Sequence, residues 1–260
     1  MMQKRSTLLK NAFALISVMA LISAWWGVTS LGLVRPLILP SPAEVGLGLI
    51  DIWNGYLGVP FLNHFKASLS VMLLGYLSAV VVGVSLGIGM AWIPSLDRLF
   101  SPVVSAVRPI PPPAWIPLTI LWFGIDLTAK VFIVFVAAVV PCLLNSYQGI
   151  KNVPVDLLNA GRSLGATKRV LLMEIVVPAA LPVILGGLRI ALGTAWATIV
   201  AAELVVSLAG FGFLIMNGYR NLESNIVFCG MLAVAITGFL MNFLFLRLSQ
   251  KLVPWMPSEK

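Results

Sequence analysis

The segment from Asn159 to Pro178 reads NAGRSLGATKRVLLMEIVVP, and it is the longest stretch of mixed polarity between two apolar blocks of the chain. It combines four small residues with three cations: Ala160, Gly161, Gly165 and Ala166, and Arg162, Lys168 and Arg169. A cationic, closely packing segment that is tethered on both sides by apolar helices is expected to be a docking surface for a soluble protein. The rest of the sequence must then supply the frame that holds it.

The composition of the chain indicates an integral membrane protein. Of its 260 residues 60% are apolar and only 10% are charged, whereas a soluble domain carries about 25% charged residues. So few charges cannot cover a water-facing surface, and membrane lipid is the expected environment. Lys and Arg in cytoplasmic loops explain the formal net charge of +8, so we expect no nucleic-acid partner.

Six apolar segments are predicted to be membrane-spanning helices, because each is long enough to cross a hydrocarbon core of about 30 Å. They cover about 11–34, 67–93, 103–124, 131–150, 179–207 and 226–246. The first is longer than the apolar core of a signal peptide and lacks a small-residue cleavage site. The sequence therefore predicts an all-α integral membrane protein with one transmembrane domain over residues 1–260. In the second span, Gly75, Gly83, Gly87 and Gly89 predict close packing between helices.

The Lys and Arg residues of the connecting segments orient these spans. Eleven fall on one side, at 4, 5, 10, 98, 151, 162, 168, 169, 247, 251 and 260, and four on the other, at 35, 66, 130 and 220. Because such residues accumulate in cytoplasmic loops, both termini and the loop 151–178 are predicted to be cytoplasmic. We expect this loop to fold as a helix that starts near Pro154, a left-handed corner at Gly165 and a second helix from Thr167 to Pro178.

Two segments are predicted to lie on the outer side. Residues 35–66 are less apolar and should carry a surface helix near 43–53, started by Ser41 and Pro42. Residues 208–225 are rich in glycine, but Phe211 and Phe213 are too apolar for a free loop. We therefore expect this second segment to dip back and help to close the outer face.

Five prolines in nine residues interrupt the third span. Proline lacks an amide donor and blocks a regular helix, and broken backbone at membrane depth requires protein or water to satisfy the freed carbonyls. Such a segment either lines a translocation pathway or is a structural kink, and the sequence does not decide between the two. The residues of this broken-helix segment are Arg108, Pro109, Pro111, Pro112, Pro113, Trp115 and Pro117.

The fifth span carries polar residues on one predicted helical face. Arg189, Gly193, Trp196, Val200, Glu203 and Ser207 follow one another in steps of four, three, four, three and four. Ionisable groups inside a span usually face a cavity or a partner. We favour this face, together with Phe211 and Phe213, as part of the translocation pathway or its gate. The alternatives are structural: Arg189 can snorkel at the inner end, and Glu203 can pair near the outer interface.

The sequence lacks the residues for catalysis or metal binding. It holds no phosphate-binding GxxxxGK[ST] pattern, no catalytic triad or carboxylate pair at usable spacing, and no metal-ligand cluster. Energy for uphill transport must then come from an ion gradient or from another subunit. Gradient-driven carriers typically show inverted repeats and intramembrane acids; here repeats are absent and Glu203 is the only acid deep in a predicted span. A separate energising subunit that docks on loop 151–178 is the favoured interpretation.

The loop resembles the EAA loop of ABC importer permeases. That pattern is Glu-Ala-Ala, three residues, Gly, nine residues and then Ile-x-Leu-Pro, and its spacing is kept here. The matching positions are Asn159, Ala160, Gly161, Gly165, Ile175, Val177 and Pro178. Asn159 replaces the glutamate of the pattern, Gly161 an alanine and Val177 a leucine.

Further segments resemble the permeases for taurine, alkanesulfonates and nitrate. They are 38–42, 108–118, 122–125, 201–204 and 210–213. The resemblance implies a type I ABC importer permease bundle in a bacterial inner membrane, with the loop as its cytoplasmic coupling helix. It also implies a homodimer, two ATPase subunits that bind ATP and Mg²⁺, and an extracytoplasmic binding protein. The implied solute is a small anion, taurine or another organosulfonate first, with nitrate, bicarbonate or a small organic acid as alternatives.

Overall fold

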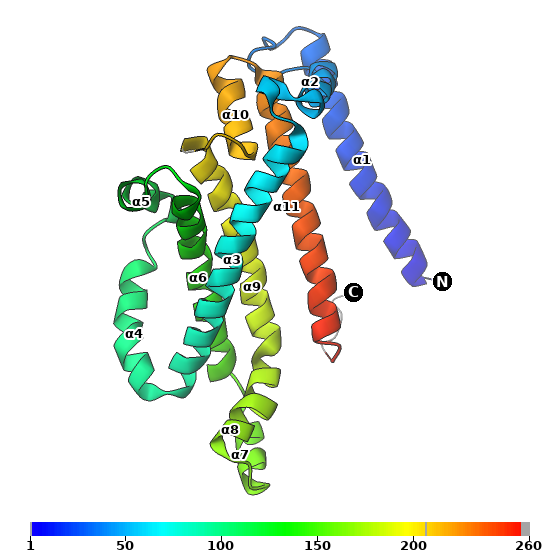
Figure 1. Ribbon diagram of the computed structural model, residues 1–260. Helices are drawn as coiled ribbons and strands as arrows, with labels where there is room; N and C mark the ends of the chain where they lie inside the picture. Colours follow the sequence, from blue (N-terminus) through cyan, green and yellow to red (C-terminus); the bar gives the residue numbers. More distant parts are fainter. Residues whose placement is uncertain (1, 206, 256–260) are drawn as a thin grey trace. The chain divides into compact units, whose positions relative to one another are not determined.

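The computed structural model describes residues 2–205 and 207–255, and every regular element in these ranges is helical (Figure 1). The elements are α1 (Met2–Ser30), α2 (Pro42–Asn54), η1 (Tyr56–Gly58), α3 (Phe61–Trp92), α4 (Pro94–Val107), η2 (Pro112–Trp115), α5 (Ile116–Phe123), α6 (Leu127–Lys151), α7 (Val155–Ser163), α8 (Lys168–Val170), η3 (Leu171–Val176), α9 (Val177–Val205), α10 (Phe211–Arg220) and α11 (Ser224–Leu252). The first two η elements are 3₁₀ turns and η3 is a π-helical turn. The predicted all-α fold is confirmed.

Four helical stretches in the described ranges are long and apolar enough to cross a membrane: Phe61–Trp92, Leu127–Lys151, Lys168–Val205 and Ser224–Leu252. They cover the second, fourth, fifth and sixth predicted spans. The first predicted span falls on α1, where the apolar stretch Leu15–Ser30 is shorter. The predicted total of six spans, and the single domain built from them, stay predictions.

The third predicted span, 103–124, is not one helix. α4 ends at Val107, a 3₁₀ turn follows at Pro112–Trp115, and α5 is a separate helix of 8 residues. The prolines explain the break, because each removes an amide donor and its ring crowds the preceding turn. The residues that connect the second and third predicted spans are also helical, since α4 begins at Pro94, in a first turn where proline is tolerated.

The chain forms two compact units. One contains the residues up to His64 together with Leu214–Ala233, and the other contains Phe65–Phe213 together with the residues from Val234 onward.

In the first unit, α2 begins with a capping box. The Ser41 hydroxyl accepts a hydrogen bond from the Glu44 amide at 3.2 Å, and the Ser41 amide donates to the Glu44 carboxylate at 2.7 Å. Val45 and Ile52 then pack with Cys229 in a buried apolar cluster. The predicted helix is confirmed, while its place on the outer surface stays a prediction, and a capping serine directly before a proline was sufficient to place its start.

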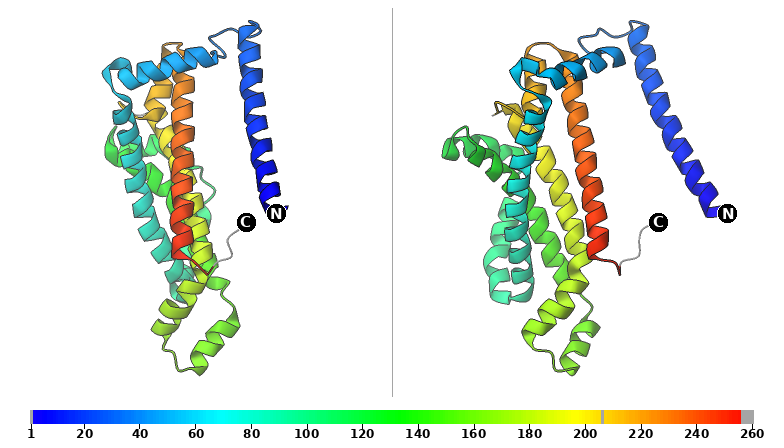
Figure 2. Two further views of the ribbon diagram at one scale, coloured as in Figure 1. Left: turned by 90° about the vertical axis from the view of Figure 1, so that its right-hand side faces the viewer. Right: turned by 45° about the vertical axis from the view of Figure 1, so that its right-hand side comes forward.

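In the second unit, small residues allow the spans to pack backbone to backbone (Figure 2). A Cβ on Gly83 would lie 2.7 Å from the Cys142 Cβ, and one on Gly87 would lie 2.4 Å from the Leu143 carbonyl oxygen, so α3 and α6 are in direct contact. α9 packs against α6 in the same way, where a Cβ on Gly187 would lie 2.2 Å from the Asn145 Cβ. This is the packing predicted for small residues in membrane helices.

Candidate functional site

The loop of residues 151–178, called the docking loop below after its predicted role, contains the predicted corner (Figure 1). α7 ends in a Schellman motif: the Ala166 amide donates to the Gly161 carbonyl at 3.0 Å, and the Gly165 amide donates to the Arg162 carbonyl at 3.0 Å. Gly165 has a φ of 80°, a left-handed conformation that favours glycine. The sequence therefore identified both the corner and the residue that makes it.

The second helix of the docking loop starts as predicted but continues further. The Thr167 hydroxyl caps it by accepting a hydrogen bond from the Val170 amide at 3.4 Å. From Lys168 the chain then stays helical to Val205, so the expectation that Pro178 closes the loop was wrong. Pro178 has no amide to bond the carbonyl four residues earlier, and its ring crowds that carbonyl. The π turn of η3 ends at Val176, two residues before Pro178.

Gly161 lets α7 pack onto the second helix. It is buried, and a Cβ there would lie 2.6 Å from the Ile175 Cδ1 and 2.7 Å from the Leu171 Cδ1. Both atoms are the ends of flexible side chains, so a small shift would accommodate an alanine, the residue that the EAA pattern has at this position. The two helices of the loop are thereby held together as one rigid corner.

The outer face of the corner is exposed and mixes apolar with cationic side chains. The exposed residues that the sequence assigned to docking are Asn159, Ala160, Arg162, Gly165, Lys168 and Arg169. Leu164, which the sequence analysis did not single out, is 88% exposed at the tip, and Leu157 on α7 is exposed as well. Exposed leucines beside cations suit a surface that another protein covers. Leu164 could have been found from its place next to the corner glycine.

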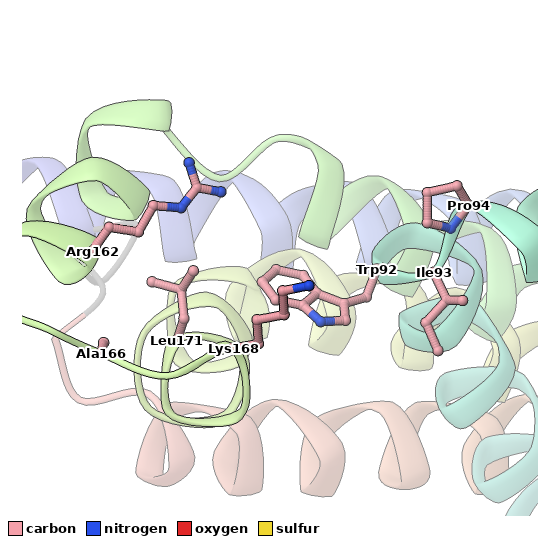
Figure 3. A pocket seen from close by; sticks show the side chains of 7 residues that line it. All are labelled: Trp92, Ile93, Pro94, Arg162, Ala166, Lys168 and Leu171. Atoms are coloured by element: carbon pink, nitrogen blue, oxygen red, sulfur yellow. The ribbon is translucent and has the colours of Figure 1, made fainter.

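A cavity of about 490 Å³ lies beside this corner (Figure 3). It is lined by Trp92, Ile93, Pro94, Arg162, Ala166, Lys168 and Leu171. Figure 3 shows that the first three come from the turn between α3 and α4 and the other four from the docking loop. The proximity of these two groups was not predictable, because about 70 residues separate them along the chain.

The face predicted on the fifth span is only partly one surface. Arg189 is exposed and donates from Nε to the Asn242 Oδ1 at 2.8 Å, and the Trp196 indole donates to the Val234 carbonyl at 3.1 Å, so both contact α11. Gly193 is exposed, with no atom within 4 Å of a Cβ placed there. Val200 is half-buried on the same helix. Ser207 lies beyond the helix, because α9 ends at Val205.

The C-terminal end of α9 carries a buried carboxylate. Glu203 is 2% exposed and accepts hydrogen bonds from the Ser68 hydroxyl, at 2.8 and 2.9 Å to its two oxygens, and from the Gly212 amide at 2.9 Å. Phe211 is buried against Trp196, with ring centroids 6.1 Å apart, and Phe213 is half-buried. The sequence analysis did not link Ser68 or Gly212 to Glu203. Ser68 lies 135 residues before Glu203, and Gly212, though only 9 residues after it, bonds through its backbone amide, which has no residue signature.

The broken-helix segment lies mostly at the surface of the chain. Arg108 and four of its prolines are exposed, and Pro112 is half-buried. The indole nitrogen of Trp115 is buried and has no hydrogen-bond partner within the described ranges. After it, Ile116 joins Ile133 and Ala202 in a buried cluster that ties α5 to α6 and α9.

One charged network lies at the start of α4. The Asp97 carboxylate accepts hydrogen bonds from the Ser101 hydroxyl at 2.7 Å and the Tyr147 hydroxyl at 3.0 Å. These bonds and the charge of Lys151 hold the pKa of Asp97 below its usual value, against the opposing effect of desolvation. Within the described ranges, no group of three His, Cys, Asp or Glu side chains is placed to hold a metal ion.

Comparison with known proteins agrees with this architecture. Residues 79–257 match the family model described as "Binding-protein-dependent transport system inner membrane component". The chain is 36% identical over 237 residues to the taurine transport system permease protein TauC of Escherichia coli, covering 90% of this chain and 86% of TauC. It is 31% identical over 238 residues to the putative aliphatic sulfonates transport permease protein SsuC of Bacillus subtilis, covering 92% and 85% of the two chains.

A solved structure shows the same fold. In an inward-facing conformation of the MetNI methionine ABC transporter, one chain superimposes with a TM-score of 0.65 at 21% sequence identity, over 74% of this chain and 95% of that one. The family match covers more than half of the sequence and includes the docking loop and the whole of α9. The chain therefore belongs to the family of binding-protein-dependent transport system inner membrane components, as an ABC importer permease.

Proposed function

We propose that this permease imports a small organosulfonate, with taurine as the first candidate. Two of its relatives are named for taurine and for aliphatic sulfonates. Nitrate, bicarbonate or another small organic acid, moved by the same mechanism, is the alternative. In such importers the solute is delivered by a binding protein, so the solute is identified more directly from that partner than from the permease.

The observation that carries the proposed mechanism is the exposed corner of the docking loop. It places Leu164 and three cations at the tip of a rigid helix pair. The sequence has no phosphate-binding loop, so we assign ATP, Mg²⁺ and hydrolysis to a partner ATPase that receives this corner in a groove. Acidic side chains in that groove would meet Arg162, Lys168 and Arg169.

A continuous helix connects the docking surface to the outer end of the permease. The stretch Lys168–Val205 has 38 residues, which is roughly 55 Å at about 1.5 Å per residue. Movement of the docking loop, when two ATPase subunits close on ATP, would be transmitted along this helix towards Glu203. The proposed complex contains two copies of this chain, two ATPases and one extracytoplasmic binding protein. Both termini lie in the cytoplasm of a bacterial cell.

Two measurements test this assembly. Native mass spectrometry of the permease co-expressed with its ATPase should show two copies of each, and a permease recovered alone or with one ATPase would contradict the stoichiometry. Calorimetry on the binding protein should show tighter binding of taurine than of nitrate or bicarbonate. Preference for either inorganic anion would replace the organosulfonate and leave the importer mechanism untouched.

A further inference from the structure

A buried polar cluster fixes the start of α10 and the connection that leads to it from α9. Ser68 on α3 and Glu203 on α9 are 0% and 2% exposed, and they accept hydrogen bonds from the first two amides of α10. We propose that Ser68, Glu203 and residues 210–212 form a latch, called the Glu203 latch below, and that Glu203 is a positioning residue and not a ligand of the transported solute. This role rests on the proposed transport function and adds a conformational latch to it.

The hydrogen bonds of the latch depend on one another. The Ser68 hydroxyl donates to the Glu203 carboxylate and accepts a hydrogen bond from the Phe211 amide at 3.0 Å. The carboxylate in turn accepts from the Gly212 amide at 2.9 Å. Loss of Ser68 would remove a partner of both the Phe211 amide and the Glu203 carboxylate, and loss of Glu203 would remove a partner of both the Gly212 amide and the Ser68 hydroxyl. Such a cluster is expected to be either closed or open, with few states between.

The backbone of the connection lies directly on the carboxylate. Gly210 has a φ of 125°, and a Cβ there would lie 2.4 Å from the Glu203 Cδ and Oε1. A Cβ on Gly212 would lie 2.4 Å from the Val200 carbonyl oxygen. No room for a solute is left between the carboxylate and the chain while the latch is closed. These two contacts leave no space for a side chain at either position, which explains why both ends of the sequence Gly-Phe-Gly are glycine.

Charge gives a second argument against solute binding by Glu203. The proposed solute is an anion, and a carboxylate repels an anion in a low-dielectric site. The Gly212 amide and the Ser68 hydroxyl that donate to Glu203, and the Phe211 amide that donates to Ser68, are also the donors that an anionic solute would need. In the closed latch, these donors are bonded within the chain and are not available to a solute.

Aromatic packing extends the latch to neighbouring helices. The Phe211 ring meets Trp196 at 6.1 Å and Phe65 at 6.3 Å between centroids, both nearly edge to face. Ser207 lies in the connection between α9 and α10, and its hydroxyl accepts a hydrogen bond from the Lys130 amine on α6 at 3.2 Å. The connection is therefore held by α3, α6 and α9 just before the chain leaves this unit after Phe213. Release of the latch would free the start of α10.

Hydrogen–deuterium exchange of the full-length permease in nanodiscs tests the latch directly. We expect the amides of Phe211 and Gly212 to exchange about tenfold faster or more in Glu203→Gln and Ser68→Ala than in the wild type, while the peptide covering 131–150 is unchanged. Ser70→Ala is the matched control, because Ser70 is exposed two residues along α3 and its hydroxyl bonds only the Ala67 carbonyl of its own helix. It should exchange like the wild type. Gly210→Ala, which crowds the carboxylate without removing a donor, should behave like Glu203→Gln.

Transport kinetics separate a positioning role from a ligand role. In the complex with ATPase and binding protein, the latch variants should lower the maximal uptake rate and raise ATP hydrolysis in the absence of binding protein, with the KM for the solute unchanged. Wild-type exchange at residues 211 and 212 in both Glu203→Gln and Gly210→Ala would overturn the latch. If Glu203→Gln raised the KM for the solute tenfold but left the amide exchange at wild-type rates, Glu203 would be a solute ligand instead. Exchange is measured on the permease alone, so its result is independent of whether the ATPase drives transport.

Discussion

At the scale of single residues, Gly165 decides the shape of the docking surface. Its left-handed φ of 80° costs other L-residues about 1–2 kcal/mol, and no atom lies within 4 Å of a Cβ placed there. A substitution at this position therefore adds a side chain to the exposed tip without a clash inside the chain. Asparagine tolerates this conformation after a helix, which makes it a control for aspartate of nearly equal size.

We expect Gly165→Asp to abolish ATP-dependent transport and Gly165→Asn to keep most of it. Only the aspartate adds a negative charge where the ATPase would have to meet three cations. The measurement is the amount of ATPase that co-purifies with each variant, and membrane insertion and dimer formation should be normal in both. Full recovery of the ATPase with Gly165→Asp would refute the docking role.

Asp97 gives a prediction for pH dependence. Its pKa lies below the usual value of 3.8 because of hydrogen bonds from Ser101 and Tyr147 and the charge of Lys151. A group whose folded pKa is lowered stabilises the fold above its unfolded pKa and loses this contribution as the pH falls through the folded value. The melting temperature of the wild type should therefore fall between pH 5 and pH 2.5 more steeply than that of Asp97→Asn.

The same melting experiment has an internal control. Ser101→Ala removes the hydrogen bond with the largest effect on Asp97 and leaves the Tyr147 bond in place, so its slope should lie between those of the wild type and Asp97→Asn. Identical slopes for all three proteins would show that the Asp97 network does not stabilise the folded permease.

Residue types alone identified Glu203 but not its role. An acid inside a span is a functional candidate by default, and the sequence analysis placed it on a pathway-facing surface. The structure gives it Ser68 and Gly212 as partners, which lie 135 residues before it and 9 residues after it. A helical period describes one helix at a time, so it could not predict a hydrogen bond between α3 and the start of α10.

At the scale of helices, two adjacent glycines of α9 have opposite surroundings. Gly187 is buried, and a Cβ there would lie 2.2 Å from the Asn145 Cβ on α6. Gly186 is exposed, with no atom within 4 Å of its Cβ position. The pair therefore separates the effect of close helix packing from the general effect of glycine in a helix.

We expect Gly187→Ala to destabilise the permease by about 1–3 kcal/mol, the usual range for an overpacked core. Gly186→Ala should be neutral or should stabilise by up to about 1 kcal/mol, because alanine is the better helix former. Unfolding in detergent, followed by tryptophan fluorescence, measures both. Equal effects of the two substitutions would mean that α6 and α9 do not touch at this point.

Element boundaries were predictable where local chemistry sets them. Ser41 and Pro42 placed the start of α2, and Gly165 placed the end of α7. Prediction failed at Pro178, because the helix continues through this residue after the π turn of η3, which has no residue signature. The third predicted span separates into α4, η2 and α5. Apolar length alone would make it one helix, and the prolines correctly predicted its interruption.

At the scale of the whole molecule, the permease is a set of membrane helices that carries a docking corner at one end of a long helix and a buried latch at the other. Composition and charge distribution predicted a membrane protein with a cytoplasmic docking loop, and the resemblance of that loop to the EAA pattern predicted an ABC importer permease. The cavity beside Trp92 and the latch around Glu203 were not predictable, because each joins segments that are distant along the chain. The docking corner and the latch belong to one proposed mechanism, in which ATP hydrolysis on a partner moves solute through this chain.

Uptake of labelled taurine into proteoliposomes tests that claim most directly. Vesicles should hold the permease and its ATPase, with the binding protein outside and ATP with Mg²⁺ inside. We expect uptake that requires ATP, the ATPase and the binding protein, and that is lost with Gly165→Asp in the permease. Uptake by the permease alone, driven by a proton or sodium gradient without the ATPase, would contradict the account and identify a gradient-driven carrier.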